Sequence, residues 1–141
     1  MSIENRSILA LFRFGNLIHN FNKRAEKEMG LSLAQWSVLK QLIDLPGTSA
    51  HHLAKTVGVH PSTLSQTLKR LEKKGFLFYF EDPKDSRRKQ ISITKSGKIT
   101  LEEFELKTLS FSKELSIFEN ELNKMSSFLT EGSRLGSEFS L

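Results

Sequence analysis

The segment HPSTLSQTLKRLEKKG, residues 60–75, is the stretch of this sequence on which the fold depends. Pro61 favours the first turn of a helix, because its fixed φ is helical and its missing N–H would have no partner there. His60 can cap the start of that helix, and Gly75 ends it. Leucines at helical spacing predict that one face of the helix is buried: Leu64, Leu68 and Leu71.

The opposite face of this helix is small and polar at its start and basic toward its end. Small side chains let a helix approach base edges closely, and a glutamine there can pair with adenine. Lysine and arginine bind guanine or phosphate, and the N–H groups of a helix start favour phosphate. An ordinary amphipathic helix with a solvated basic face is the alternative. The residues of this helix expected to contact DNA are Pro61, Ser62, Thr63, Ser65, Gln66, Lys69, Arg70 and Lys73.

Residues 5–29 predict one long helix that ends at Gly30. A helix that is apolar on several faces must be buried on several sides, and in so small a protein this favours packing against another chain. One apolar stripe consists of Leu11, Phe14, Ile18, Phe21 and Ala25, whereas Leu9, Phe12 and Leu17 lie off it.

Two shorter helices are expected between the long helix and residue 60. Ser32 opens the first through a capping box with Gln35, and the Pro-Gly pair at 46–47 stops it. Ser49 opens the second, AHHLAKTV, which Gly58 closes. This short helix, a tight link and the capped next helix make a helix-turn-helix, the motif that places its last helix in the major groove. Ser49 is included among the residues expected to contact DNA.

After Gly75 the apolar residues change their period, which indicates strands. FLFYF (76–80) and QISIT (90–94) predict a β-hairpin, and EDPKDSRRK (81–89) predicts a long charged tip. The helices followed by this hairpin form a winged helix-turn-helix. The expected fold class is therefore mainly α with a small β-hairpin wing.

Two more helices are expected after the hairpin. Thr94 caps a long helix that runs to about residue 114, and a capping box of Ser116 and Glu119 opens a final helix from 117 to about 130. The remaining tail is expected to be loosely ordered. Neither an internal repeat nor a linker is evident, so the 141 residues predict one domain, 1–141.

Basic residues are concentrated in the middle of the chain. Residues 60–98 contain ten Lys/Arg and four Asp/Glu, whereas the rest of the chain is nearly neutral within a net charge of +5. This placement suggests a local surface that binds a polyanion. The absence of cysteine excludes disulfides, thiolate metal sites and cysteine-based redox sensing.

The segments LSLAQWSVLKQL, PGTSAHHLAKTVGVHPSTLSQTLKRLEKKGFL and EDPKDSRRKQISITKSGK resemble the MarR family of bacterial transcriptional regulators. The resemblance covers Leu31 to Lys98, and its most specific part is the wing, with Asp-Pro, then Asp-x-Arg, then a strand ending in Thr and a following Gly. It implies that Arg87 enters the minor groove and that Asp85 orients it. Arg88 and Lys89 are then expected to contact phosphates.

The resemblance also implies a homodimer that binds double-stranded DNA at a pseudo-palindrome. Residues 5–30 and 95–131 would be dimerisation helices, and residues 31–94 would form the winged helix-turn-helix lobe. Many members of the family respond to small aromatic ligands bound between these parts. The candidate ligand residues are Phe12, Phe14, His19, Trp36 and Phe104, although aromatics at helical spacing are more often plain core, which is the interpretation we favour.

No metal site and no cofactor are expected. His51, His52 and His60 are close in sequence, but adjacent histidines on a helix point to different sides and a carboxylate cluster at ligand spacing is missing. His51 and His52 are expected near DNA phosphates or simply exposed.

An enzyme is not expected, because the sequence contains no GxSxG, no HExxH and no phosphate-binding glycine loop. The expected function is that of a ligand-responsive transcriptional repressor. The alternative is a winged-helix protein-interaction module or an anti-repressor without its own operator. No apolar stretch long enough to span a bilayer and no signal peptide are evident, so a cytoplasmic location is expected and no membrane partner.

Overall fold

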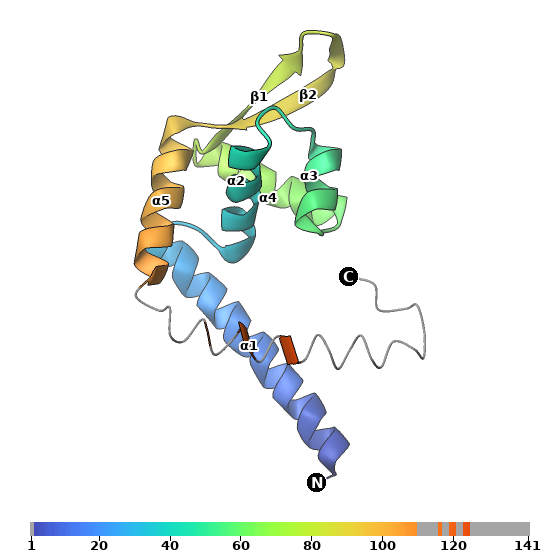
Figure 1. The fold of residues 1–141 in the computed structure, drawn as a ribbon, viewed down its shortest axis with the longest axis vertical. Helices are drawn as coiled ribbons and strands as arrows, with labels where there is room; N and C mark the ends of the chain where they lie inside the picture. Colours follow the sequence, from blue (N-terminus) through green and yellow to red (C-terminus); the bar gives the residue numbers. More distant parts are fainter. Residues whose placement is uncertain (1, 110–115, 117–118, 121–122, 125–141) are drawn as a thin grey trace. The chain divides into compact units, whose positions relative to one another are not determined.

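The computed structural model of the protein describes residues 2–109, 116, 119, 120, 123 and 124. Its elements follow in the order α1 (Ile3–Met29), α2 (Leu33–Asp44), α3 (Ala50–Val57), α4 (Pro61–Lys73), β1 (Leu77–Asp82), β2 (Asp85–Ile93) and α5 (Lys95–Leu109) (Figure 1). This mainly helical architecture with one antiparallel hairpin confirms the predicted fold class.

The chain divides into two compact units, Met1–Phe104 and Glu105–Leu141. The first unit holds all the elements described below, up to the first turns of α5. The expected continuation of α5 to about residue 114, and most of the expected final helix from 117 to about 130, lie outside the described residues. One domain over 1–141 stays a prediction.

Serine side chains cap the starts of α1, α2 and α3, because the first N–H groups of a helix have no partner within the helix. The Oγ atoms of Ser2, Ser32 and Ser49 each accept a hydrogen bond from the N–H three residues later, at 3.2 Å. At Ser32 the predicted capping box with Gln35 is confirmed, since the Gln35 side chain also accepts the Ser32 N–H.

The end of α4 differs by one residue from the prediction. Lys74 is the C-cap, and Gly75 follows it with a φ of +78°. The N–H of Phe76 donates to the carbonyl of Leu71 at 3.0 Å and the N–H of Gly75 to that of Glu72 at 2.9 Å. This pair of bonds is a Schellman motif, which needs a left-handed residue and so favours glycine at 75.

The hairpin is longer than predicted, and its charged segment is not a long tip. β1 and β2 continue through Asp82 and Asp85, and only residues 83–84 form the turn. Strand pairing uses backbone N–H and C=O groups, so polar side chains on an exposed hairpin do not end it. The register shifts between Glu81 and Asp82, which pair with Lys89 and Asp85. Residues 86–88 therefore bulge from the ladder.

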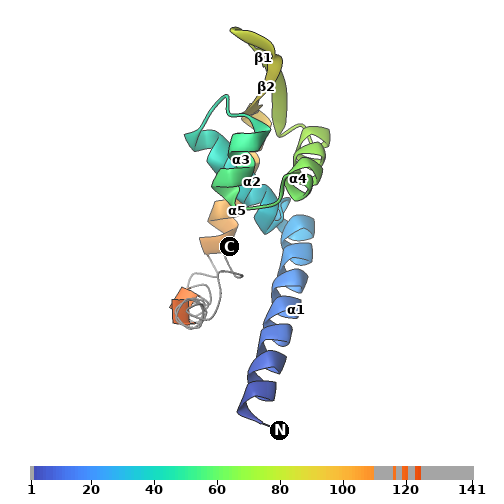
Figure 2. The same ribbon diagram turned by 90° about the vertical axis from the view of Figure 1, so that its right-hand side faces the viewer.

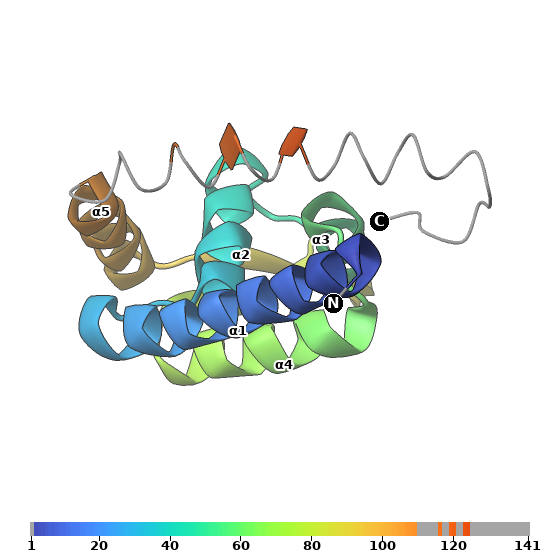
Figure 3. The same ribbon diagram turned by 90° about the horizontal axis from the view of Figure 1, so that it is seen from below.

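The helices α2, α3 and α4 pack on one another, and the hairpin extends away from them (Figures 1 and 2). Figure 3 shows α2 between α3 and the first turns of α5. The loop between α2 and α3 pairs with the hairpin at one point, because Thr48 and Ile91 form an isolated antiparallel β-bridge. This arrangement places the start of α4 and the tip of the hairpin on one winged-helix lobe.

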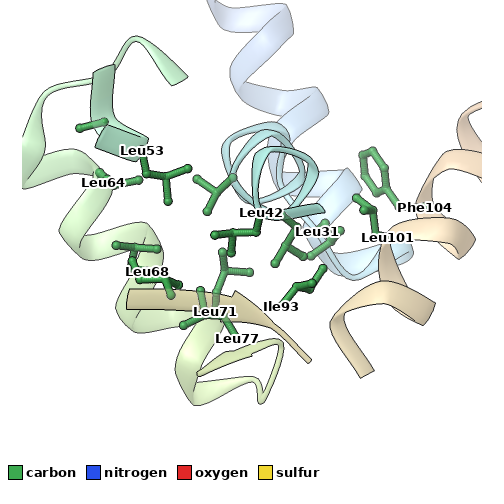
Figure 4. Packing of buried hydrophobic residues seen from close by; sticks show 14 of the residues in the cluster. Leu31, Leu42, Leu53, Leu64, Leu68, Leu71, Leu77, Ile93, Leu101 and Phe104 are labelled. Atoms are coloured by element: carbon green, nitrogen blue, oxygen red, sulfur yellow. The ribbon is translucent and has the colours of Figure 1, made fainter. Parts of the chain in front are cut away.

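A single apolar core holds the lobe together. The predicted inner leucines of α4, Leu64, Leu68 and Leu71, are at most 3% exposed. Figure 4 shows Leu42 of α2 between the leucines of α3 and α4 on one side and the residues of α5 on the other. The latter are Leu101 and Phe104. The core therefore fixes α4 with its polar face outward.

Only the last third of α1 belongs to this core. Ala25 is 1% exposed, and Phe21 and Met29 pack against the core. Nearer the N-terminus, large apolar side chains are exposed in the single chain. Contacts among the described residues therefore do not bury α1 on several sides: Ile8, Leu11, Phe12 and Leu17 are 51–66% exposed.

Candidate nucleic-acid interface

The start of α4 is capped by His60, as predicted. Its Nδ1 accepts the Ser62 N–H at 3.2 Å and lies 2.7 Å from the Ser62 Oγ. Pro61 occupies the first helical position. The helix therefore begins with small side chains, which allow a close approach, while the Ser62 N–H is already used by the His60 cap.

All the residues of α4 predicted to contact DNA are exposed. Ser62, Gln66, Lys69 and Lys73 lie opposite the buried leucines, and the others lie beside this face; together they combine hydroxyl, amide and cationic groups. Such a face can bind base edges at its polar start and phosphates at its basic end. The exposed set is Pro61, Ser62, Thr63, Ser65, Gln66, Lys69, Arg70 and Lys73.

Ser49 differs from this set because its side chain already has a structural role. Its hydroxyl caps α3 by accepting the His52 N–H, and the residue is half-buried. His51 and His52 are exposed at the start of α3. No group of three or more His, Asp or Glu that could hold a metal occurs within the described residues.

Asp85 binds both arginines of the bulge at the hairpin tip. Its Oδ1 accepts from the Nε of Arg87 at 3.2 Å and from the Arg87 N–H at 3.1 Å, and its Oδ2 lies 3.9 Å from the Nε of Arg88. The side chains of Arg87 and Arg88 are 91% and 76% exposed. Asp85 therefore makes a short contact with Arg87 and a longer one with Arg88 at the hairpin tip. Lys89 is exposed beside them.

Lys74 behaves differently from the other basic residues of this region, and the sequence did not reveal this. Its Nζ donates to Glu26 Oε1 at 3.0 Å, to Gln35 Oε1 at 2.9 Å and to the Gly30 carbonyl at 3.3 Å. Gln35 Nε2 donates to the same Glu26 oxygen at 3.0 Å. We call these four residues the Lys74 junction. It joins the end of α4 to the end of α1 and the start of α2.

The junction stabilises the charged form of Glu26. The hydrogen bond from Gln35 and then the hydrogen bond from Lys74 lower the pKa of Glu26 below its ordinary value of 4.5. The only sequence signal for any of these contacts was the capping box, which identified Gln35 but not its partners across the fold.

The candidate ligand residues are not gathered around one site in the single chain. Phe104 is buried in the core, Phe14 and Trp36 are half-buried, and Phe12 and His19 are exposed. A surface hollow along α1 includes Phe14 but none of the other four candidates, and its lining residues are Arg6, Leu9, Ala10, Arg13, Phe14 and Leu17. Within the described residues, no helix has both the length and the hydropathy needed to cross a membrane.

Residues 31–89 match the sequence model of the MarR family. The transcriptional activatory protein BadR of Rhodopseudomonas palustris is 31% identical over 101 residues, which are 70% of this chain and 58% of BadR. The chain thus spans little more than half of that relative. An uncharacterized HTH-type transcriptional regulator of Bacillus cereus is 33% identical over 116 residues, which are 82% of this chain and 76% of the relative.

Two solved structures extend the likeness of fold to most of the chain. The transcriptional repressor CouR, bound to a 23-mer DNA duplex, has a TM-score of 0.69 at 24% identity, with 87% of this chain and 89% of CouR covered. A mutant of MepR from S. aureus, bound to an oligodeoxyribonucleotide, has a TM-score of 0.58 at 25% identity, with 92% of this chain and 98% of MepR covered.

Proposed function

Because this chain belongs to the MarR family, it is a transcription regulator and not an enzyme, and we propose that it is a homodimeric repressor that binds a pseudo-palindromic operator. The observation that carries the proposal is the exposed face of α4, where every predicted contact residue is accessible while the leucines behind it are buried. The DNA in the CouR and MepR structures supports the same partner.

The two parts of the lobe have different tasks in this proposal. The start of α4 enters the major groove, where Gln66 reads a base edge, and the basic residues at its end contact phosphates. At the hairpin tip, Arg87 enters the minor groove, which attracts arginine where it is narrow and A·T-rich. Asp85 keeps that arginine oriented, and Arg88 and Lys89 neutralise neighbouring phosphates. Ser49 supports the contact by fixing the start of α3.

The exposed apolar residues of α1 support the homodimer. Four large apolar side chains that are more than half exposed on one helix are costly to leave in water, and a second copy would bury them. Two lobes joined in this way would bind half-sites about one helical turn, roughly 34–36 Å, apart. A chromosomal operator requires a cytoplasmic protein, which is the location we propose.

We further propose that a small aromatic ligand controls this dimer by changing the distance between its two lobes. The support for such a ligand is the family resemblance, because the aromatic candidates do not share one site in the single chain. Repression is the direction that we favour, as in CouR, although BadR is named as an activator. Structures of the free and liganded dimer with identical lobe spacing would refute this mechanism.

The function is tested by fluorescence anisotropy with a labelled duplex from upstream of the protein's own gene and a scrambled duplex as control, both in about 0.15 M salt. Tight binding to the native duplex alone is expected. Affinity should fall steeply with added salt, because bound phosphates release counterions. Absence of binding to both duplexes at low salt would contradict the proposal and indicate a protein partner instead.

Gln66→Ala is expected to weaken binding to the operator by about 1–3 kcal/mol and to leave binding to random DNA nearly unchanged. The reason is that an amide paired with a base edge contributes only at the matching base pair. The measurement is the ratio of the two affinities for wild type and variant. Equal losses on operator and random DNA would remove Gln66 from the residues that read sequence.

A further inference from the structure

We propose that Lys74 is a positioning residue for DNA recognition, which acts with Glu26 and Gln35 to fix the direction of α4 relative to α1. The inference rests on the proposed function, because it concerns the geometry of the two recognition helices in a dimer formed through α1. It assigns to Lys74 a role inside the protein rather than on the DNA.

The hydrogen bonds of the junction support this role. Lys74 is the C-cap of α4, Glu26 lies in the last turns of α1, Gly30 is the C-cap of α1, and Gln35 is in the first turn of α2. An ammonium group has three N–H donors, and the three acceptors of the junction use all of them. A single side chain thus joins the ends of three helices.

The position of the ammonium group is also favourable electrostatically. It lies 3.3 Å from the Gly30 carbonyl, at the C-terminal end of α1, where unpaired carbonyls create negative potential. Gln35 is 2% exposed, so its amide is fixed by the core rather than by solvent. The Lys74 side chain is only 30% exposed. Its ammonium group is therefore positioned by hydrogen bonds to the ends of α1 and α2, although the residue as a whole is exposed like Lys69 and Lys73.

The junction lies at the base of α1, where a small rotation of the helix produces a large displacement of its far end. The contacts of α1 with the core come from its last third, at Phe21, Ala25 and Met29. Residues 3–20 would then extend roughly 27 Å from the lobe at 1.5 Å per residue. A rotation of about 10° at the junction would displace the far end by about 5 Å. In a dimer formed through α1, such a rotation changes the distance between the two α4 helices.

The contribution of the junction to stability is expected to be small, so its geometric role can be measured separately. Glu26 and Lys74 both keep about a third of their side-chain surface exposed, and ion pairs of this kind contribute little to folding. Loss of Lys74 should therefore loosen the direction of α1 before it unfolds the lobe.

The test measures the distance between a label on α1 and a label on α4 of the same chain by pulsed electron–electron double resonance. The chain contains no cysteine, so Asn16→Cys on α1 and Ser65→Cys on α4 give two unique exposed sites for nitroxide labels. Labelled chains are mixed with an excess of unlabelled wild type, so that only distances within a chain contribute. The parent is expected to show a narrow distribution.

Lys74→Met, which removes the charge and all three donors at similar size, is expected to broaden this distribution or shift it by several ångströms. Lys98→Met removes an exposed charge from α5 and should leave the distribution unchanged. A second matched pair separates charge from size: Glu26→Gln neutralises the junction carboxylate, whereas Glu28→Gln neutralises one that pairs, among the described residues, with Arg24 on the same helix. A changed distance distribution in Glu26→Gln, together with an unchanged one in Glu28→Gln, supports the proposal.

The DNA readout uses the operator and a random duplex. Lys74→Met is expected to lower affinity for the operator about tenfold relative to Lys98→Met, while the two variants bind random DNA alike. An unchanged distance distribution in Lys74→Met and Glu26→Gln would overturn the proposal. A sample labelled only at Ser65→Cys, without dilution, tests the dimer itself: absence of a distance between protomers there would refute the homodimer, whereas the distance within a chain still decides the role of Lys74.

Discussion

Gly97→Ala is expected to destabilise the protein by about 3 kcal/mol, which corresponds to a fall in Tm of roughly 10 °C. A Cβ at residue 97 would lie 2.3 Å from the carbonyl oxygen of Phe76 and 2.8 Å from Cγ1 of Ile93. Neither neighbour can easily give way. The Phe76 carbonyl accepts the Thr94 N–H at 3.0 Å, and the Phe76 N–H belongs to the Schellman motif at the end of α4.

The same close approach fixes where α5 begins. Thr94 accepts the Gly97 N–H on its Oγ1 at 3.0 Å and donates the same hydroxyl to the Gly75 carbonyl at 2.7 Å. A methyl group at residue 97 would push α5 away from Gly75 and break this link. The cost therefore includes lost hydrogen bonds as well as overpacking.

Gly15→Ala is the matched control, because Gly15 also lies in a helix but, apart from the backbone of that helix, no heavy atom of the described residues lies within 4 Å of an added Cβ. Alanine favours the helix over glycine by about 1 kcal/mol, so this variant should be as stable as wild type or slightly more stable. Urea unfolding followed by circular dichroism measures both. Equal free energies of unfolding for Gly97→Ala and Gly15→Ala would show that α5 can shift to make room for a methyl group without loss of stability.

Arg87→Ala is expected to reduce affinity for the operator by roughly tenfold to a hundredfold, or about 1.4–2.8 kcal/mol, and to relax any A·T preference beneath the wing. The side chain is 91% exposed, and among the described residues it contacts Asp85. Its loss should leave the fold unchanged. The variant therefore reports on DNA contact rather than on stability.

The measurement compares anisotropy titrations on operators with A·T or G·C pairs at the positions beneath the wing. Lys98→Ala removes one exposed positive charge from α5 and serves as the control for net charge. Arg87→Ala should lose the difference between the two operators, whereas Lys98→Ala should keep it. A variant that still distinguishes A·T from G·C would show that Arg87 does not read the minor groove.

Most of the helical part of the lobe was predictable from the sequence, because its signals are local. The capping box of Ser32 and Gln35, the proline at 61 and the glycine at 75 act over one turn of chain, and the structure confirms the elements that they delimit. The leucine spacing of α4 likewise predicted which face is buried and which is exposed. The DNA-contacting role of that exposed face remains a proposal.

The hairpin tip and the Lys74 junction were decided by tertiary structure. Composition predicted a long charged tip, but backbone pairing continues through polar residues and a register shift makes residues 86–88 bulge. Lys74 was counted with the basic surface, although it binds Glu26, which is 48 residues away in the sequence. Thus the sequence by itself determined the helices and their faces, since these depend on neighbours within a turn or two. Only the fold decided that Lys74 binds Glu26 and Gln35, because this depends on which helix ends the core brings together.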